Sequence, residues 1–144
     1  MKLALEQAQK AYDRDEVPVG AVIIKDGQVI ASTCNQVIKA NDPSAHAEMN
    51  AIRDASRHLA SEFLVGCDLY VTLEPCPMCA FAIALARIDR VFFGAYDPKM
   101  GGVESGPRIF NSSSCHHKPE VYGGLKEEEC GALLKKFFAS KREK

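Results

Sequence analysis

Hydrophobic residues recur along this chain with two different periods, and the alternation of those periods predicts an α/β protein. Apolar positions three and four apart indicate helices, whereas short runs of β-branched residues indicate strands. Two of these runs flank the sequence Lys25-Asp26-Gly27-Gln28, whose central Asp-Gly is typical of a tight hairpin turn. The pattern predicts helices at 2–14, 44–60, 80–87 and 125–140 and strands at 19–24, 28–33, 68–72 and 90–94.

Polar and helix-breaking residues mark where these elements begin and end. Ser44 is expected to cap the second helix, and Pro75 and Pro77 frame the start of the third. Residues 97–118 are rich in glycine, proline and serine, so they are expected to form a long loop. A hairpin followed by helix–strand alternation buries a sheet between helices. With 144 residues and no linker or repeat, residues 1–144 are predicted to form one domain.

Composition narrows the class of protein further. No apolar run reaches the roughly 20 residues that span a bilayer, and the N-terminus lacks the apolar stretch of a signal peptide. We therefore expect a cytoplasmic protein without a membrane partner. Cysteines stay reduced in that compartment. Only Cys76 and Cys79 have the spacing of metal ligands, and simple packing is expected for Cys34, Cys67, Cys115 and Cys130.

The charge of the chain is unevenly distributed. The net charge is −1, yet residues 135–144 carry five basic side chains and one acidic one, against 13 basic and 18 acidic in the remainder. A basic tail on an acidic body is compatible with a polyanionic partner, and equally with a solvated chain end.

Two short motifs indicate the chemistry: His46-Ala47-Glu48 and Pro75-Cys76-Pro77-Met78-Cys79. Each lies where a predicted helix begins. Cysteines three apart on a helical turn face the same side, and the positive helix end favours their thiolate form. Side chains two apart point to nearly opposite faces in mid-helix, so His46 and Glu48 reach one site only at the mouth of a helix.

One imidazole and two thiolates are ligands that suit Zn²⁺. Three protein ligands leave a fourth position for water, as in catalytic zinc sites, and zinc lowers the pKa of that water to roughly 7. We expect one zinc per chain held by His46, Cys76 and Cys79, with Glu48 moving protons rather than binding metal. The alternative is a closed structural zinc site, completed by one of Cys34, Cys67, Cys115, His116 or His117.

Together the two motifs match the H-x-E…P-C-x-x-C signature of zinc nucleobase deaminases. The chain resembles the cytidine deaminase superfamily, and within it the bacterial tRNA-specific adenosine deaminases, over nearly its whole length. The similar segments are 15–21, 42–48, 70–76, 86–88 and 91–95, whereas 103–124 fits only some members. The resemblance implies a three-layer α/β/α fold with a mixed five-stranded sheet, a homodimer, and conversion of wobble adenosine to inosine in a tRNA anticodon loop.

The resemblance also implies roles for residues outside the two motifs. Val19 would form an apolar wall for the base, Asn35 would contact the base or ribose, and Asp97 would lie near the ribose. Without the resemblance, Val19 would be interpreted as a core residue, and Asn35 and Asp97 as turn residues. An aromatic residue beside basic ones can stack on a base and hold phosphates. RNA contacts are therefore expected from Phe138, Lys141 and Arg142, with at least one of Phe137 and Phe138 in the core.

Two other functions remain open at this point. A free-base or nucleoside deaminase acting on guanine or cytosine would share both zinc motifs and would not need a basic tail. A non-catalytic, zinc-stabilised RNA-binding module would have four protein ligands on its metal.

Overall fold

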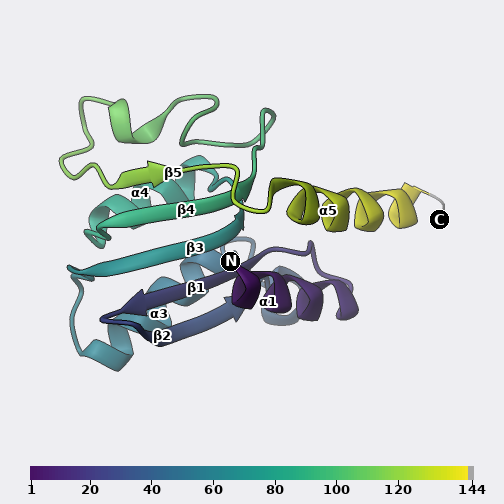
Figure 1. Cartoon of the computed structure of the whole chain (residues 1–144), viewed down its shortest axis with the longest axis horizontal. Helices are drawn as coiled ribbons and strands as arrows, with labels where there is room; N and C mark the ends of the chain where they lie inside the picture. The colour runs from purple at the N-terminus through teal and green to yellow at the C-terminus, as the bar shows by residue number, and fades with distance from the viewer. Residues whose placement is uncertain (143–144) are drawn as a thin grey trace.

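The chain forms a mixed five-stranded sheet, described here from a computed structural model over residues 1–142 (Figure 1). The strand order is β2-β1-β3-β4-β5, with β1 antiparallel to both neighbours and β3, β4 and β5 parallel. This confirms the expected mixed sheet. The strands are β1 (Gly20–Lys25), β2 (Gln28–Cys34), β3 (Cys67–Leu73), β4 (Arg90–Ala95) and β5 (Glu120–Tyr122).

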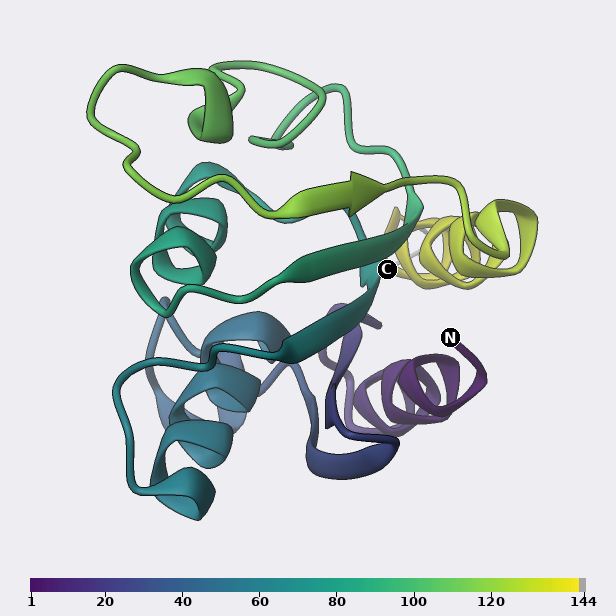
Figure 2. The same ribbon diagram turned by 60° about the vertical axis from the view of Figure 1, so that its left-hand side comes forward.

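Helices cover both faces of the sheet. The helices are α1 (Lys2–Asp13), α2 (Val37–Ala40), α3 (Ala47–Leu59), α4 (Pro77–Leu85), α5 (Glu127–Arg142) and the short 3-10 helix η1 (Ile109–Asn111). Figure 2 shows α3 and α4 on one side of the sheet and α1 and α5 on the other. The three layers confirm the α/β/α architecture expected from the resemblance.

The first hairpin forms where the Asp-Gly pair predicts it. Asp26 and Gly27 both have positive φ, at 51° and 76°, which the twist of a tight hairpin requires. Gly20, at the start of β1, lies under α1, where a Cβ would be 2.0 Å from the Ala4 carbonyl oxygen. Glycine here and alanines at positions 4 and 8 therefore let α1 lie directly on the sheet.

The core follows the central strands. Side chains of β1, β3 and β4 such as Ile23, Leu69 and Phe93 are fully buried, as expected for strands covered on both faces. The buried stripe of α3 is made of small residues, including Ala51 and Ala55, so this helix approaches the sheet closely. The ends of β3 and β4 and the starts of α3 and α4 are thereby held in a rigid frame.

One local prediction is wrong. The second helix begins at Ala47 rather than Ser44, because the Ser44 amide and hydroxyl both donate to Asp42 Oδ1, at 2.9 and 2.7 Å. Ser44 thus closes a turn and does not cap the helix. The pattern of apolar residues also did not reveal α2 or β5, which contain four and three residues.

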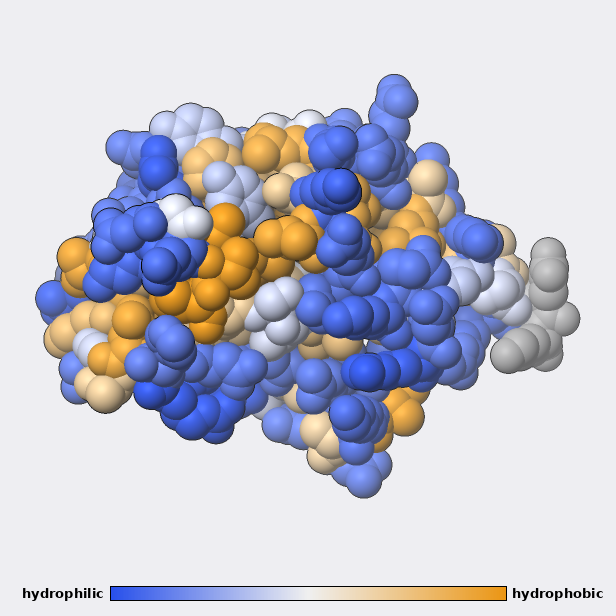
Figure 3. Space-filling model, turned by 60° about the horizontal axis from the view of Figure 1, so that its bottom comes forward, coloured by the Kyte–Doolittle hydropathy of each residue, from blue (hydrophilic) through white to orange (hydrophobic). Residues whose placement is uncertain are grey.

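The face of the molecule in Figure 3 carries a patch of hydrophobic side chains beside a larger hydrophilic area. None of the helices within residues 1–142 is long and apolar enough to cross a bilayer.

Candidate metal centre and substrate pocket

Two helix N-termini bring the sequence motifs together. His46 is the N-cap residue of α3 and Cys76 the N-cap residue of α4, and both have extended backbone with φ of −69°. Cys79 lies in the first turn of α4, after Pro77 at its first position. Strand β3 ends at Leu73, three residues before Cys76, so the end of this strand positions the start of α4.

The three expected ligand atoms converge. His46 Nδ1 lies 3.6 Å from Cys76 Sγ and 3.5 Å from Cys79 Sγ, and all three donor atoms lie within 4.8 Å of one another. A tetrahedral zinc with ordinary Zn–N and Zn–S bond lengths separates such a nitrogen and sulfur by about 3.6 Å. The donor set and its spacing therefore fit a zinc ion.

The closed-site alternative finds no support in the described part of the chain. His46, Cys76 and Cys79 form the one cluster of potential ligands within residues 1–142, and none of the other cysteines or histidines joins it. Three of the remaining thiols, Cys34, Cys67 and Cys130, are buried in the core, and burial raises the pKa of each. Three protein ligands are thus available, which is the number found in catalytic sites.

The two thiols of the cluster shift each other's pKa in opposite directions. A hydrogen bond from the Cys79 thiol lowers the pKa of Cys76 to about 4, and the same contact, with burial, raises the pKa of Cys79. The Cys76 sulfur in turn raises the pKa of His46. The lowered pKa of Cys76 favours its thiolate, the form that binds metal.

Glu48 lies next to the cluster without belonging to it. It is in the first turn of α3, is 4% exposed, and lines the same pocket as His46 and Cys76. Burial raises its pKa to about 7. A carboxyl group with a pKa near neutrality is suited to accept and return a proton at physiological pH.

Asn35 has a role that its position after β2 did not predict. Its Oδ1 accepts the backbone N–H of Ala47 at 2.8 Å, at the start of α3. The cap that Ser44 was expected to provide therefore comes from a residue 12 positions away in the sequence. The side-chain oxygen holds the start of α3 between His46 and Glu48, and Asn35 also lines the pocket.

The pocket over the cluster has a volume of about 450 Å³. Val19 is 4% exposed and contributes apolar lining, and Asp97 and Met100 also line the pocket. Asp97 also has the turn role weighed for it, since its Oδ1 accepts the amides of Lys99 and Met100. The structure thus places Val19, Asn35 and Asp97 around one cavity.

The C-terminal helix reaches the mouth of this pocket. Phe137 is buried, which confirms that one of the two phenylalanines belongs to the core, whereas Phe138 is 45% exposed. Lys141 lines the pocket and forms an ion pair with Asp15. Phe138 and Arg142 line a neighbouring apolar cavity of about 850 Å³ that shares Lys141 and Asp97 with the first. Residues 143 and 144 of the basic tail lie outside the described residues.

Sequence reasoning missed two buried carboxylates that hold the walls of the pocket. Glu16 accepts the amides of Ile38 and Lys39 at 2.9–3.1 Å, and Glu74 accepts those of the loop after β4. Both are less than 4% exposed. Glu74 stands between Leu73 and Pro75, and this apolar and proline context could have identified it as a buried acid needing partners, whereas Glu16 follows the charged Asp15 and has no such signal.

Comparisons with known proteins agree with this geometry. A relative named tRNA-specific adenosine deaminase, from Agrobacterium fabrum, is 55% identical over 142 residues, covering 99% of this chain and 93% of its own. A solved structure from a study of A-to-I editing by tRNA:A34 deaminases has a TM-score of 0.92 at 55% identity, over 93% of this chain and 97% of that one. Guanine deaminase from Bacillus subtilis is 33% identical with a TM-score of 0.64, over 98% and 90%.

A match to a family model covers the proposed zinc site. The model of the cytidine and deoxycytidylate deaminase zinc-binding region matches residues 1–95, which include the three potential ligands and Glu48. This chain belongs to the cytidine and deoxycytidylate deaminase family.

Proposed function

We propose that this protein is a zinc-dependent hydrolytic deaminase that converts the wobble adenosine of a tRNA anticodon loop to inosine. One observation carries the proposal: the chain is 55% identical over nearly its whole length to a tRNA-specific adenosine deaminase. The His46–Cys76–Cys79 cluster with Glu48 beside it supplies the groups that hydrolytic deamination needs.

In this proposal His46, Cys76 and Cys79 bind one zinc ion per chain. Zinc held by three protein ligands keeps one position for water and lowers the pKa of that water to about 7. The rigid helix starts, with Asn35 holding the amide of Ala47, keep the imidazole and the two sulfurs in place.

Glu48 is proposed to move the protons of the reaction. It accepts a proton from water and delivers it to the ring nitrogen beside the reacting carbon while the water oxygen bonds to that carbon. It then carries the remaining proton of that oxygen to the amino group, and the carbon–nitrogen bond breaks to release ammonia. Adenosine and water thereby become inosine and ammonia. The pocket shields this transfer from bulk solvent, because Glu48 is almost fully buried.

The walls of the pocket are proposed to bind the nucleotide. Val19 gives the base an apolar surface, the Asn35 amide NH₂ donates to the base or ribose, and Asp97 lies near the ribose. Around the mouth, Phe138 can stack on a flanking base, and Lys141 and Arg142 can hold phosphates. These three residues are on the exposed side of α5, where they can contact the parts of the RNA that stay outside the pocket.

A free-base deaminase is the second candidate, because the Bacillus subtilis guanine deaminase has the same fold at 33% identity. The two functions separate in one assay: the purified protein is incubated with an anticodon stem-loop, and in parallel with free guanine, cytosine and adenosine. We expect inosine in the stem-loop. Release of ammonia from a free base, with an unchanged stem-loop, would reverse the assignment.

We also propose that the protein is a cytoplasmic homodimer. All six cysteines are free, which supports a reducing compartment. The outer side of α4 exposes Met78 and Leu85, at 39% and 66%, and no charged residue lies on this helix. A second copy of the chain could cover this face. Sedimentation should give a dimer for the wild type and a monomer for Leu85→Lys, and an equal mass for the two would refute this interface.

A further inference from the structure

Glu74 gathers the loop between β4 and η1 around a single carboxylate. Its Oε1 accepts the Asp97 amide at 3.0 Å and the Ser105 hydroxyl at 3.0 Å. Its Oε2 accepts the amides of Val103, Glu104 and Ser105, at 3.2, 2.8 and 2.9 Å. Five donors from two ends of one loop therefore meet one side chain, which stands at the end of β3 two residues before Cys76.

The surroundings of Glu74 are built for a charged group. The residue is 2% exposed. The five donors of the loop replace the water that burial removes from its two oxygens. Gly101 lies against the carboxyl carbon, where a Cβ would come within 2.6 Å, so the loop closes on Glu74 without a side chain in between.

The loop that Glu74 holds is a wall of the substrate pocket. Asp97 and Met100 line the cavity over the metal cluster, and the same two residues line the neighbouring cavity beside α5. The Asp97 amide binds Glu74, while the Asp97 carboxylate accepts the Met100 amide at 3.0 Å. A continuous series of hydrogen bonds therefore runs from Glu74 to both wall residues.

We propose that Glu74 is a positioning residue that fixes the Asp97–Met100 wall and thereby sets the affinity for substrate RNA. The inference rests on the proposed function, because the wall is taken to bind the nucleotide. Glu74 also lines this pocket, but it is not one of the three residues of the metal cluster, and in this proposal it acts through the wall rather than by binding the RNA. Its loss should therefore weaken substrate binding far more than the chemical step.

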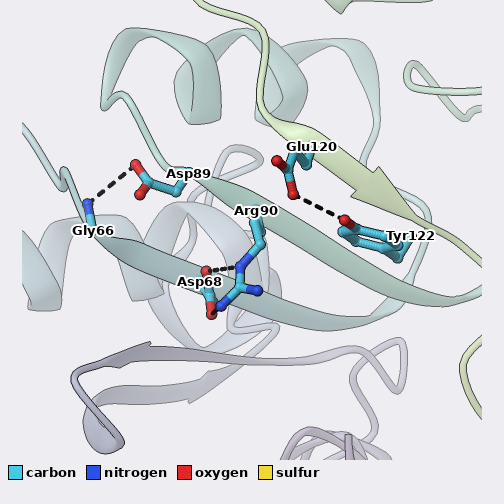
Figure 4. A network of polar contacts seen from close by, with 6 residues as sticks. All are labelled: Gly66, Asp68, Asp89, Arg90, Glu120 and Tyr122. Atoms are coloured by element: carbon cyan, nitrogen blue, oxygen red, sulfur yellow. Dashed lines mark hydrogen bonds and ion pairs between the residues drawn. The ribbon is translucent and has the colours of Figure 1, made fainter.

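The test uses Glu74→Gln in the full-length, zinc-loaded protein. Glutamine keeps the size of the side chain but replaces one acceptor oxygen with an NH₂ donor, which faces the N–H donors of the loop. Glu120→Gln is the matched control: the same chemical change at an exposed carboxylate, which accepts the Tyr122 hydroxyl at 2.9 Å (Figure 4). Residue 120 is paired with Arg90 at the start of β4, whereas the pocket lies beyond the end of that strand.

Two readouts are needed. The first is amide hydrogen exchange without RNA, in which the amides of 97 and 103–105 should lose protection in Glu74→Gln and keep it in Glu120→Gln. The second is steady-state deamination of the stem-loop. KM should rise roughly tenfold, as expected for a lost hydrogen bond to a charged group, while kcat and zinc content stay within about twofold of the wild type.

Each unfavourable result has a distinct meaning. Unchanged protection of these amides in Glu74→Gln would show that Glu74 does not hold the wall. Lost protection with an unchanged KM, or with a fall in kcat alone, would show that the wall does not set RNA affinity. Failure of the wild type to deaminate the stem-loop would refute the proposed function instead, and the exchange experiment would still decide whether Glu74 fixes the loop.

Discussion

Asn35 is expected to contribute both to the stability of the fold and to substrate binding, and mutation can separate the two contributions. The Asn35 Oδ1 accepts the amide of Ala47, a residue with no exposed surface. Asn35→Ala leaves that buried amide without its acceptor, which costs about 1–3 kcal/mol. A chain of 144 residues has an unfolding entropy of roughly 0.3 kcal/mol/K, so Tm should fall by about 3–10 °C.

Asn35→Asp separates the two roles. It keeps an oxygen acceptor at the N-terminus of α3, where a negative charge is favourable, but removes the amide NH₂ that is proposed to donate to the base or ribose. We expect Asn35→Asp to recover most of the Tm lost in Asn35→Ala, and both variants to deaminate the stem-loop poorly.

Thermal unfolding followed by circular dichroism, with the deamination assay on the same samples, measures both effects. Asn111→Ala, at an exposed asparagine outside the site, is the control and should melt like the wild type. If Asn35→Ala also melts within a degree of the wild type, its hydrogen bond does not hold α3. If Asn35→Asp deaminates normally, the NH₂ group has no part in substrate binding.

Four further outcomes follow from the site. Glu48→Gln should keep zinc and fold but lose at least about 10²-fold in inosine formation, and a normal rate would exclude the proton-transfer role. Replacing Lys141 and Arg142 together with alanine should weaken RNA binding and lower the salt dependence of the binding constant by roughly one or two ions. An unchanged salt dependence would show that neither side chain contacts phosphate. A strong chelator should abolish turnover, and added zinc should restore it; activity that survives complete metal removal would contradict the zinc assignment. Because the folded-state pKa of Glu74 is lowered, its carboxylate stabilises the fold fully above about pH 5, and the Tm difference between wild type and Glu74→Gln should narrow below about pH 4.

The sequence predicted the elements whose physical signals are local. The hairpin follows from Asp26-Gly27, and the long helices and buried strands follow from apolar periodicity. Placing His46 and Glu48 at the mouth of a helix required only that two side chains two positions apart face one site. The local chemistry of the two motifs likewise indicated three ligands and one carboxylate.

The parts that sequence reasoning missed depend on contacts between distant segments. Ser44 is a residue type that often caps helices, but its hydroxyl donates to Asp42 instead. The amide at the start of α3 is accepted by Asn35, which follows β2. Glu16 accepts amides of the short helix α2 and Glu74 those of a loop, in both cases more than 20 positions away, and no local pattern contains such contacts. Strand β5 has only three residues and forms because β4 offers it a free edge.

Position-specific detection of inosine tests the central claim most directly. The zinc-loaded protein is incubated with an anticodon stem-loop carrying adenosine at the wobble position, and the RNA is then digested and its nucleosides identified by mass spectrometry. We predict inosine at the wobble position alone, and none with Glu48→Gln. An unmodified stem-loop, together with deamination of free guanine or cytosine by the same sample, would contradict the assignment.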